Sequence, residues 1–304
     1  MQKGFQKFRI GYFADGPWAH EALKILVADE SIQVCFICPR SDSNDVILEA
    51  LSKKYNIDWI ITENINLPAF HERLKYYKCD LFVSMSFNQI FKRDTIEIPS
   101  LKTINCHAGK LPFYRGRNIL NWALINDANE FGITVHYIDE GVDTGDIILQ
   151  RVFPITDNDN YCTLLNKAYV ECADILCTAI KLIQSGTAPR ISQASIHPIG
   201  FYCIQRKEGD EILDWNQNSR HIFNFIRAIC SPGPMARTFL GNKEVKINKA
   251  AMIPEASMFK GIPGSVLGVS KGAFIVKTLD TFIKITEWDF NGKIKTGDRF
   301  HHSC

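Results

Sequence analysis

The first third of the chain alternates short apolar runs with amphipathic segments, and this alternation constrains the fold more than any other feature. Apolar runs at 8–13, 32–38, 81–84 and 101–106 have the length of strands, and the segments between them carry apolar residues at helical spacing. Strands that alternate with helices predict a parallel sheet with right-handed crossovers. We therefore expect a Rossmann-like, doubly wound parallel α/β sheet.

The periodicity changes after residue 200. Residues 189–198 are polar, which predicts the start of a linker. From Ala236 onward the apolar residues recur every second position, with Gly-Asn and Lys-Gly turns between the runs. Several short strands at close spacing predict a small barrel or sandwich. We expect an N-terminal domain over residues 1–200 and a smaller β-rich domain over residues 201–304.

Charge and composition exclude some classes of protein. The net charge is +2, and Lys and Arg form no run, which argues against a nucleic-acid surface. The N-terminus lacks the apolar segment of a signal peptide, and no stretch has the length of a membrane-spanning helix. We expect a cytoplasmic protein with no nucleic-acid or membrane partner. Cys35 and Cys38 have metal-site spacing but no second pair, so we expect no metal.

Two polar side chains stand at the end of one apolar run. Asn105 and His107 are two residues apart, so strand alternation points both to the same face. The end of a strand is where open α/β sheets build their sites. Asp143 lies in a loop that closes another apolar run, 132–138. Each residue alone is more typical of a turn or a core than of an active site, whereas the three together with the sequence around them predict an active site.

The surrounding residues carry a family resemblance. Residues 105–117, Asn-Cys-His-Ala-Gly-Lys-Leu-Pro-Phe-Tyr-Arg-Gly-Arg, and 141–146, Gly-Val-Asp-Thr-Gly-Asp, resemble the folate-dependent formyltransferases. Within that family, Tyr114-Arg-Gly-Arg-x-x-x-Asn-Trp122 is most similar to the enzymes that formylate nucleotide-linked amino sugars. The resemblance covers most of the chain. It implies a C-terminal helix followed by an open, OB-like barrel, and a homodimer.

The resemblance implies the reaction. The donor is 10-formyltetrahydrofolate, and the acceptor is the amino group of a nucleotide-linked sugar used for surface polysaccharide or O-antigen synthesis. The best single candidate is dTDP-4-amino-4,6-dideoxyglucose, and UDP-linked and GDP-linked sugars stay open. Three alternatives also stay open: methionyl-tRNA formyltransferase, hydrolysis of the formyl-folate, and a non-catalytic sugar-nucleotide binding module. Residues 206–304 mix Lys with Asp and Glu, which argues against RNA.

Formyl transfer needs three functions from side chains. Negative charge develops on the formyl oxygen, the attacking amine must lose a proton, and the base that takes the proton must be held in place. Asn105 suits the first task through its amide NH₂. His107 suits the second because histidine titrates near neutral pH, and Asp143 would orient it.

The resemblance also implies binding residues. The family's pterin slot maps to the segments 85–90 and 137–143, whose main-chain groups would make most of the contacts to the pterin. The candidate folate residues are Met85, Ser86, Phe87, Ile90, Asp139 and Gly141. Met85, Phe87 and Ile90 are equally consistent with plain core.

Four further residues are candidates for the acceptor. Arg117 and Asn121 carry over from the family as contacts to the sugar or nucleotide, while Arg115 is consistent with a structural role. Trp18 and Arg40 follow the first two strands, at sheet ends that should face one crevice, where they could stack on or pair with a nucleotide. A Trp that packs on its own helix and a surface Arg are the alternatives.

Overall fold

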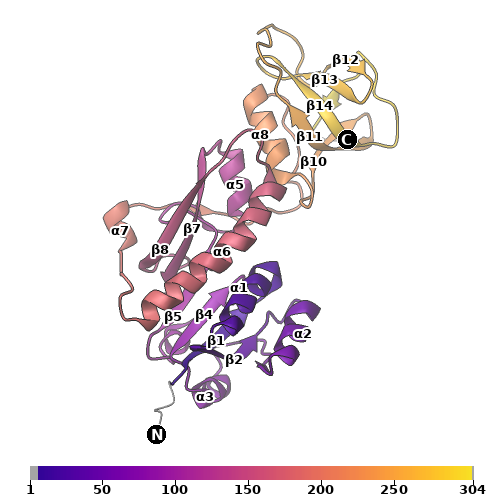
Figure 1. Cartoon of the computed structure of the whole chain (residues 1–304). Helices are drawn as coiled ribbons and strands as arrows, with labels where there is room; N and C mark the ends of the chain where they lie inside the picture. Colours follow the sequence, from indigo (N-terminus) through magenta and orange to yellow (C-terminus); the bar gives the residue numbers. More distant parts are fainter. Residues whose placement is uncertain (1–5, 303–304) are drawn as a thin grey trace. The chain divides into compact units, whose positions relative to one another are not determined.

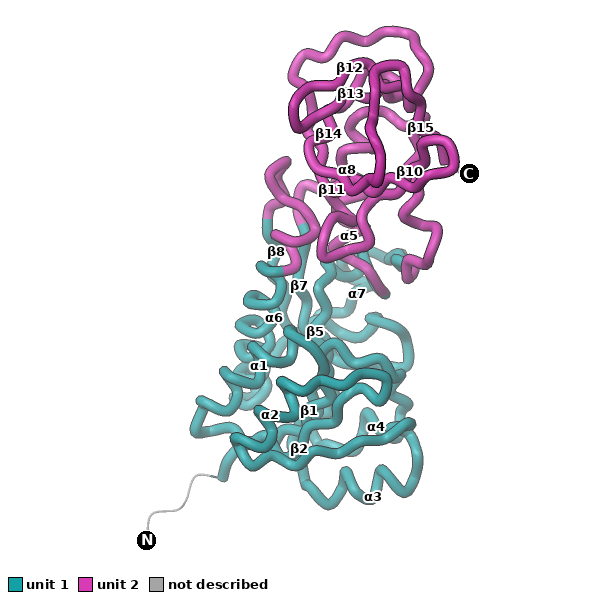
Figure 2. The backbone as a smooth tube through the Cα atoms, turned by 90° about the vertical axis from the view of Figure 1, so that its right-hand side faces the viewer, with its two compact units in different colours: residues 1–116, 131–153, 166–203 teal, residues 117–130, 154–165, 204–304 magenta. Residues whose placement is uncertain are grey.

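The computed structural model describes residues 6–302, which divide into two compact units (Figure 2). Unit 1 contains the described residues up to Gly116, together with Phe131–Phe153 and Asn166–Cys203. Unit 2 contains Arg117–Glu130, Pro154–Leu165 and the described residues from Ile204 onward. Two short segments from the expected N-terminal domain thus belong to unit 2. The boundary expected between residues 200 and 201 stays a prediction.

Unit 1 is built on a seven-stranded sheet with the order β3-β2-β1-β4-β5-β7-β8. The pairs β3–β2, β2–β1, β1–β4 and β4–β5 are parallel, and β5–β7 is antiparallel. The expected doubly wound α/β sheet is confirmed, with an antiparallel extension at one edge. The strands are β1 (Phe8–Ala14), β2 (Ile32–Cys38), β3 (Asp58–Trp59), β4 (Leu81–Met85), β5 (Thr103–His107), β7 (Glu130–Tyr137) and β8 (Ile147–Pro154).

Helices cover both faces of this sheet because side chains alternate along its strands (Figure 1). Tyr12 of β1 faces α1, where its hydroxyl donates to the carbonyl oxygen of Ala19 at 3.2 Å. Phe13 faces the opposite way, into an aromatic cluster with Phe82 that also contains Phe70 of α3. The helices of this part are α1 (Gly16–Ala28), α2 (Val46–Lys54), α3 (Pro68–Tyr76), α4 (Arg93–Ile96), α6 (Tyr161–Gln184), which begins in unit 2, and α7 (Gln193–Ile196).

The loop before α2 differs from expectation. The polar residues 42–44 suggest the N-cap, but the cap is Asp45, whose Oδ1 accepts from the backbone N–H of Leu48 at 2.9 Å. The same carboxylate accepts from the N–H of Gly16 at 2.7 Å and lies 2.8 Å from Nε2 of His20. Asp45 therefore joins the loops that follow β1 and β2, at the carboxyl end of the sheet.

Unit 2 contains the expected smaller β-rich fold, which is confirmed as a six-stranded sheet with the order β12-β13-β14-β11-β10-β15 and antiparallel pairing. Its core includes Trp215, whose ring stacks on Phe300 and whose Nε1–H donates to Thr238. The elements are α5 (Ile119–Ile125), α8 (Ser219–Ile229), β10 (Ala236–Leu240), β11 (Lys243–Ala251), β12 (Val266–Ser270), β13 (Ala273–Lys277), β14 (Phe282–Asp289) and β15 (Phe300–His301). A separate two-stranded pair in unit 1 joins β6 (Arg115–Gly116) to β9 (Tyr202–Cys203).

Candidate active site

The end of β5 presents Asn105 and His107 beside the antiparallel strand β7. The register places Asn105 opposite His136 and His107 opposite Thr134. Nδ2 of Asn105 lies 3.4 Å from Nε2 of His136. An amide nitrogen carries two hydrogens and Nε2 can accept at most one of them, so at least one N–H of Asn105 is left for another acceptor.

Asp143 receives contacts from three directions. Its Oδ2 is 3.6 Å from Nδ1 of His107 and accepts from the backbone N–H of Gly116 at 2.9 Å. Its Oδ1 is 3.4 Å from Nε2 of His136. The structure therefore places His107 in direct contact with the carboxylate of Asp143 and connects Asn105 to it through His136, while the catalytic roles of these residues stay predictions.

Opposing influences set the charge of Asp143. Burial raises its pKa, but the positive charge of His107, the contacts with His136 and the N–H of Gly116 outweigh burial. The pKa of Asp143 consequently lies well below its usual range, so the side chain is a carboxylate at neutral pH. His107 also places its Nε2 2.7 Å from the carbonyl oxygen of Tyr114. Nδ1 of the same ring faces Asp143, so each ring nitrogen of His107 faces an oxygen atom.

His136 is the residue of this cluster that sequence reasoning missed. It is buried in β7, where Nδ1 lies 2.8 Å from the carbonyl oxygen of Tyr137 and Nε2 faces both Asn105 and Asp143. A histidine in the apolar run 132–138 was a visible signal. The pairing of that run with the strand of Asn105 was not visible, because antiparallel register across a long connection leaves no local pattern.

Two glycines of the motifs have no room for a side chain. A Cβ at Gly145 would collide with the carbonyl oxygen of Tyr137. A Cβ at Gly109 would collide with the imidazole of His107 and with the carbonyl oxygen of Tyr114. These two glycines let the backbone approach closely beside His107 and within the loop that carries Asp143.

Gly145→Ala is expected to displace the loop of Asp143, because the new methyl group meets a backbone carbonyl that cannot rotate away. We expect kcat/KM for formyl transfer to fall by about tenfold or more, since small misplacements of catalytic groups are costly, together with a lower melting temperature. Steady-state kinetics and thermal unfolding measure both effects. Gly272→Ala, whose Cβ has open space although its φ is +74°, is the control for backbone strain alone. Equal losses of activity in both variants would contradict this account.

A buried glutamine ties the Asp143 loop to β6. Nε2 of Gln193 donates to the carbonyl oxygens of Asp143 at 2.8 Å and Gly145 at 2.9 Å. Its Oε1 accepts from Nε and Nη2 of Arg115 at 3.1 and 2.7 Å. The expectation of a linker at residues 189–198 is therefore wrong at this point, because Gln193 is 3% exposed and all of its hydrogen bonds are internal to unit 1. Arg115 has the structural role that the sequence left open.

Gln193→Leu is expected to leave two loop carbonyls and a guanidinium without partners. Buried polar groups that lose their partners cost about 1–3 kcal/mol each, so a clear fall in melting temperature should accompany a drop in kcat. Thermal unfolding and single-turnover formylation measure the two effects. The exposed Gln217→Leu is the matched control. Wild-type kinetics in a folded Gln193→Leu protein would show that the loop holds Asp143 without this side chain.

The candidate folate residues after β4 have mixed environments. Met85 is buried, with its Sδ 3.4 Å from the hydroxyl oxygen of Tyr12, and Phe87 packs against the aromatic cluster of unit 1. Ser86 has a left-handed backbone with φ of +56°. Ile90 is 62% exposed, so the core alternative does not hold for this residue.

The candidate folate residues after β7 shape their own loop. Oδ1 of Asp139 accepts from the N–H of Gly141 at 3.1 Å and from the hydroxyl of Thr144 at 2.5 Å. These bonds close a turn that leads into Asp143. The hydrogen bonds of Asp139 therefore stabilise its own loop, and Gly141 is exposed.

Asn88 offers a buried acceptor in the segment assigned to the pterin. Its Oδ1 is buried and has no hydrogen-bond partner among residues 6–302. A buried amide oxygen without a partner is costly, so such an atom commonly marks a place where a ligand donates. A pterin ring carries N–H donors, so the residues here fit a folate.

The residues proposed for the acceptor have partners within their own units. In unit 1 the ring of Trp18 meets Tyr169 edge-on at 4.7 Å, and Arg40 donates twice to Asp42, each at 2.9 Å. In unit 2, Nη1 of Arg117 donates to Gln205 at 3.3 Å, and Nδ2 of Asn121 donates to the carbonyl oxygen of Ala228 at 2.6 Å. Asn121 is buried, so its side chain fixes local structure.

The cysteine pair of the sequence belongs to the sheet. Cys35 and Cys38 are both buried in β2, and desolvation raises the pKa of Cys38 to about 12. In the described part of the chain, no group of three or more His, Cys, Asp and Glu side chains is placed to hold a metal ion. None of the helices in the same range is long and apolar enough to cross a membrane.

Family comparisons identify the class of protein to which this geometry belongs. The sequence model of the formyl transferase family matches residues 25–180, and that of the formyl transferase C-terminal domain matches residues 206–301. The chain belongs to the formyl transferase family. Among relatives of this formyl transferase, the methionyl-tRNA formyltransferase of Pelotomaculum thermopropionicum is 36% identical over 246 residues, covering 77% of each chain. The methionyl-tRNA formyltransferase of Syntrophomonas wolfei is 30% identical over 298 residues, covering 94% of this chain and 92% of the relative.

Solved structures share the fold of this formyl transferase. The sugar 3N-formyl transferase WlaRD, solved with dTDP and 5-N-formyl-THF, superposes with a TM-score of 0.69 at 24% identity, covering 95% of this chain and 99% of that one. The N-formyltransferase from Helicobacter canadensis, in complex with folinic acid and dTDP-3-aminofucose, gives 0.65 at 21% identity, covering 93% and 100%. At these identities the likeness concerns the fold alone.

Proposed function

We propose that this formyl transferase moves a formyl group from 10-formyltetrahydrofolate to a primary amine. The observation that carries the proposal is the cluster around the half-buried carboxylate of Asp143, which His107 contacts directly and Asn105 reaches through His136. The folate donor supplies the one-carbon unit and has its expected place beside Asn88, Met85 and the Asp143 loop. The amine nitrogen bonds to the formyl carbon as the bond to N10 of the folate breaks, one proton leaves the amine, and N10 gains one.

Each of the three side chains has a task in this reaction. The free N–H of Asn105 stabilises the negative charge that develops on the formyl oxygen. His107 acts as the base that accepts the proton lost by the amine. For this, the substrate must replace the contact between Nε2 and the carbonyl oxygen of Tyr114. Asp143 keeps the imidazole oriented and balances its positive charge. His136, on the other side of the carboxylate, orients Asn105 and Asp143.

Methionyl-tRNA is the acceptor that the comparisons favour. The relatives described above are methionyl-tRNA formyltransferases, at 36% and 30% identity, whereas the likeness to sugar formyltransferases rests on fold. Residues 204–304 also contain fifteen Lys and Arg against ten Asp and Glu, a larger basic excess than the mixed pattern first suggested. A basic excess supports binding to a polyanion.

A nucleotide-linked amino sugar is the second candidate acceptor. The sequence between Tyr114 and Trp122 supports it, as does a pocket of small-molecule size within unit 2. dTDP-4-amino-4,6-dideoxyglucose remains the first sugar to test, before UDP-linked and GDP-linked amino sugars.

One assay distinguishes the two candidate acceptors from each other and from hydrolysis of the formyl-folate. The protein is incubated with 10-formyltetrahydrofolate and, in turn, methionyl-tRNA, each nucleotide-linked amino sugar, or no acceptor. Release of tetrahydrofolate is followed together with the mass of the acceptor. Formylated methionyl-tRNA with a rate that falls steeply with salt supports the first acceptor, and a formylated sugar supports the second. If tetrahydrofolate is released and no acceptor accelerates the release, the activity is hydrolysis of the formyl-folate instead of transfer. No release at all would overturn the proposal.

A further inference from the structure

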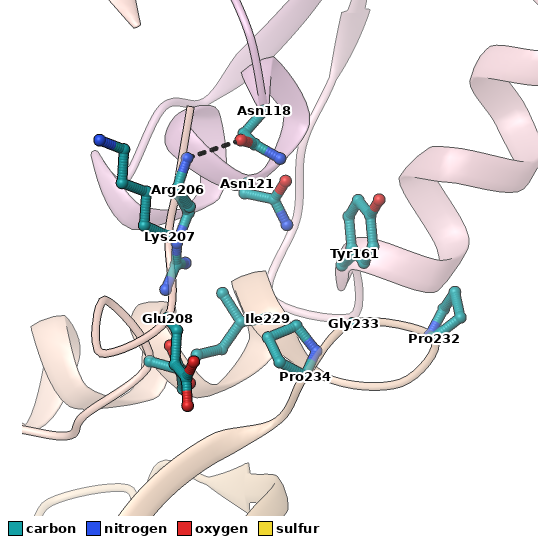
Figure 3. Close-up of a pocket in the computed structure, with 11 residues that line it drawn as sticks. Asn118, Asn121, Tyr161, Arg206, Lys207, Glu208, Ile229, Pro232, Gly233 and Pro234 are labelled. Carbon is teal, nitrogen blue, oxygen red and sulfur yellow. Dashed lines mark hydrogen bonds between the residues drawn. The ribbon is translucent and has the colours of Figure 1, made fainter. Parts of the chain in front are cut away.

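Unit 2 contains a pocket whose occupant the proposed function leaves open. Its volume is about 400 Å³, within the range of small-molecule sites. Its walls come from four separate segments of unit 2: the start of α5, the start of α6, residues 206–211 and the loop after α8. Figure 3 shows Arg206 and Tyr161 on two sides of the space, with Asn121 and Ile229 between them.

Arg206 brings an unsatisfied positive charge to this pocket. Its Nη1 is buried and has no hydrogen-bond partner in the described part of the chain. Its Nη2 donates to the carbonyl oxygen of Asp210, and its backbone N–H donates to Oδ1 of Asn118 at 2.9 Å (Figure 3). The guanidinium is therefore held in place with one donor group unused. A guanidinium fork that lacks a carboxylate partner matches the geometry of a phosphate.

The nearby acidic residues do not neutralise this charge by an ion pair. Glu211 lines the pocket but pairs with Arg237, whose Nη2 is 2.9 Å from Oε1 of Glu211. Glu208 is exposed, and no ion pair joins it to Arg206 within residues 6–302. A free carboxylate at the rim is suited to accept hydrogen bonds from sugar hydroxyls.

The opposite side of the pocket suits a planar ring. Tyr161 contributes an aromatic face, and Pro232 and Pro234 contribute apolar surface on the loop below it (Figure 3). Burial raises the pKa of Tyr161, so its hydroxyl stays protonated and can donate. An aromatic ring and a nucleobase stack favourably whatever the base. Asn118 adds an amide nitrogen that has no partner among the residues that the structure describes.

We propose that this pocket binds a nucleoside phosphate, with the phosphate on Arg206, the ribose hydroxyls at Glu208 and the base beside Tyr161. This inference rests on the proposed function, because a nucleoside phosphate is the part that both candidate acceptors share. A nucleotide-linked sugar supplies it as a diphosphate, and a charged tRNA supplies it as its terminal nucleotides.

Isothermal titration calorimetry on the full chain tests the pocket without any formyl transfer. The probes are dTDP, UDP, GDP and the trinucleotide CpCpA, with the nucleosides thymidine and cytidine to isolate the contribution of the phosphate. We expect at least one phosphate-bearing probe to bind, and its nucleoside to bind at least tenfold more weakly. A preference for a diphosphate indicates a nucleotide-linked sugar, and a preference for CpCpA indicates tRNA. Failure of every probe to bind would overturn the inference.

Two variants connect binding to the pocket. Arg206→Met is expected to weaken the phosphate-bearing probe at least tenfold, whereas Arg206→Lys, which keeps the charge, should restore part of the affinity. Tyr161→Leu should weaken the binding of nucleosides and nucleotides alike. If Arg206→Met does not fold, Tyr161→Leu tests the pocket on its own. Arg299→Met, at an exposed arginine of unit 2 outside this pocket, is the control. Equal affinities in wild type, Arg206→Met and Tyr161→Leu would place the nucleotide elsewhere.

A third variant separates this inference from the proposed function. Asn105→Asp in unit 1 should abolish transfer but bind the nucleotide with wild-type affinity. If wild-type protein binds nucleotide in the pocket yet formylates no acceptor, the result supports the pocket assignment and contradicts the proposed function. If it formylates an acceptor while Arg206→Met leaves the KM for that acceptor unchanged, the proposed function stands and the pocket assignment fails.

Discussion

Asn105→Asp is expected to lose at least about a hundredfold in kcat while remaining folded, because removing one hydrogen-bond donor at a developing oxyanion costs about that much. The substitution is nearly isosteric, but it replaces the amide NH₂ by an oxygen and places a second carboxylate beside Asp143. Negative charge next to the forming oxyanion raises the barrier further. Single-turnover formylation with saturating donor and acceptor measures the chemical step, and circular dichroism with thermal unfolding reports the fold.

The matched control for this prediction is Asn242→Asp in the turn between β10 and β11, where the side chain is exposed. It adds the same charge to the protein without touching the cluster and should keep wild-type kinetics. Turnover close to wild type in Asn105→Asp would remove Asn105 from the mechanism. Equal losses in both variants would attribute the effect to charge on the whole protein.

Asp143→Asn is expected to lower kcat by about a hundredfold to ten-thousandfold, the range over which general acid-base catalysis contributes. The carboxylate is the only negative side chain in contact with His107 and His136 among the described residues. An amide in its place cannot balance a protonated imidazole and offers an N–H toward two ring nitrogens. The pH dependence of kcat/KM should therefore change its shape as well as its height.

The same variant has a stability signature whose sign follows from the pKa. Because the folded-state pKa of Asp143 is depressed, its carboxylate stabilises the fold above the unfolded pKa of about 4. That contribution is lost as the pH falls below this value. The difference in free energy of unfolding between wild type and Asp143→Asn should thus be largest near neutral pH and shrink in acid. The exposed Asp289→Asn should show no comparable difference, and a difference that grew on acidification would contradict the charge assigned to Asp143.

Local patterns were sufficient for the elements that carry the site. The alternation of strand and helix periods predicted the α/β sheet, and the apolar runs at 8–13, 32–38, 81–84 and 101–106 correspond to β1, β2, β4 and β5. Asn105 and His107 could be placed on one face because two residues in a strand determine their own relative direction. The cap of α2 was misplaced, since Ser43 donates to Asp15, and Asp42 pairs with Arg40.

Long-range pairing decided what local patterns could not. His136 entered the cluster through the register of β7 on β5, and Gln193 entered it from a segment that reads as a linker. Their partners are 31 and 50 residues away in the chain. The same holds for Arg206, which lines a pocket together with three other segments of unit 2 that are distant from it in the chain.

The sequence by itself determined the family, the sheet and the identity of three residues of the cluster, Asn105, His107 and Asp143. Spacing within a strand and a pair of short motifs contain that information, because they act over a few residues. Only the tertiary structure decided that Asp143 stays ionised between two histidines, that a buried glutamine holds its loop, and that a guanidinium is left with a free donor. Burial and hydrogen-bond partners set each of these properties, and both arise only when distant parts of the chain meet.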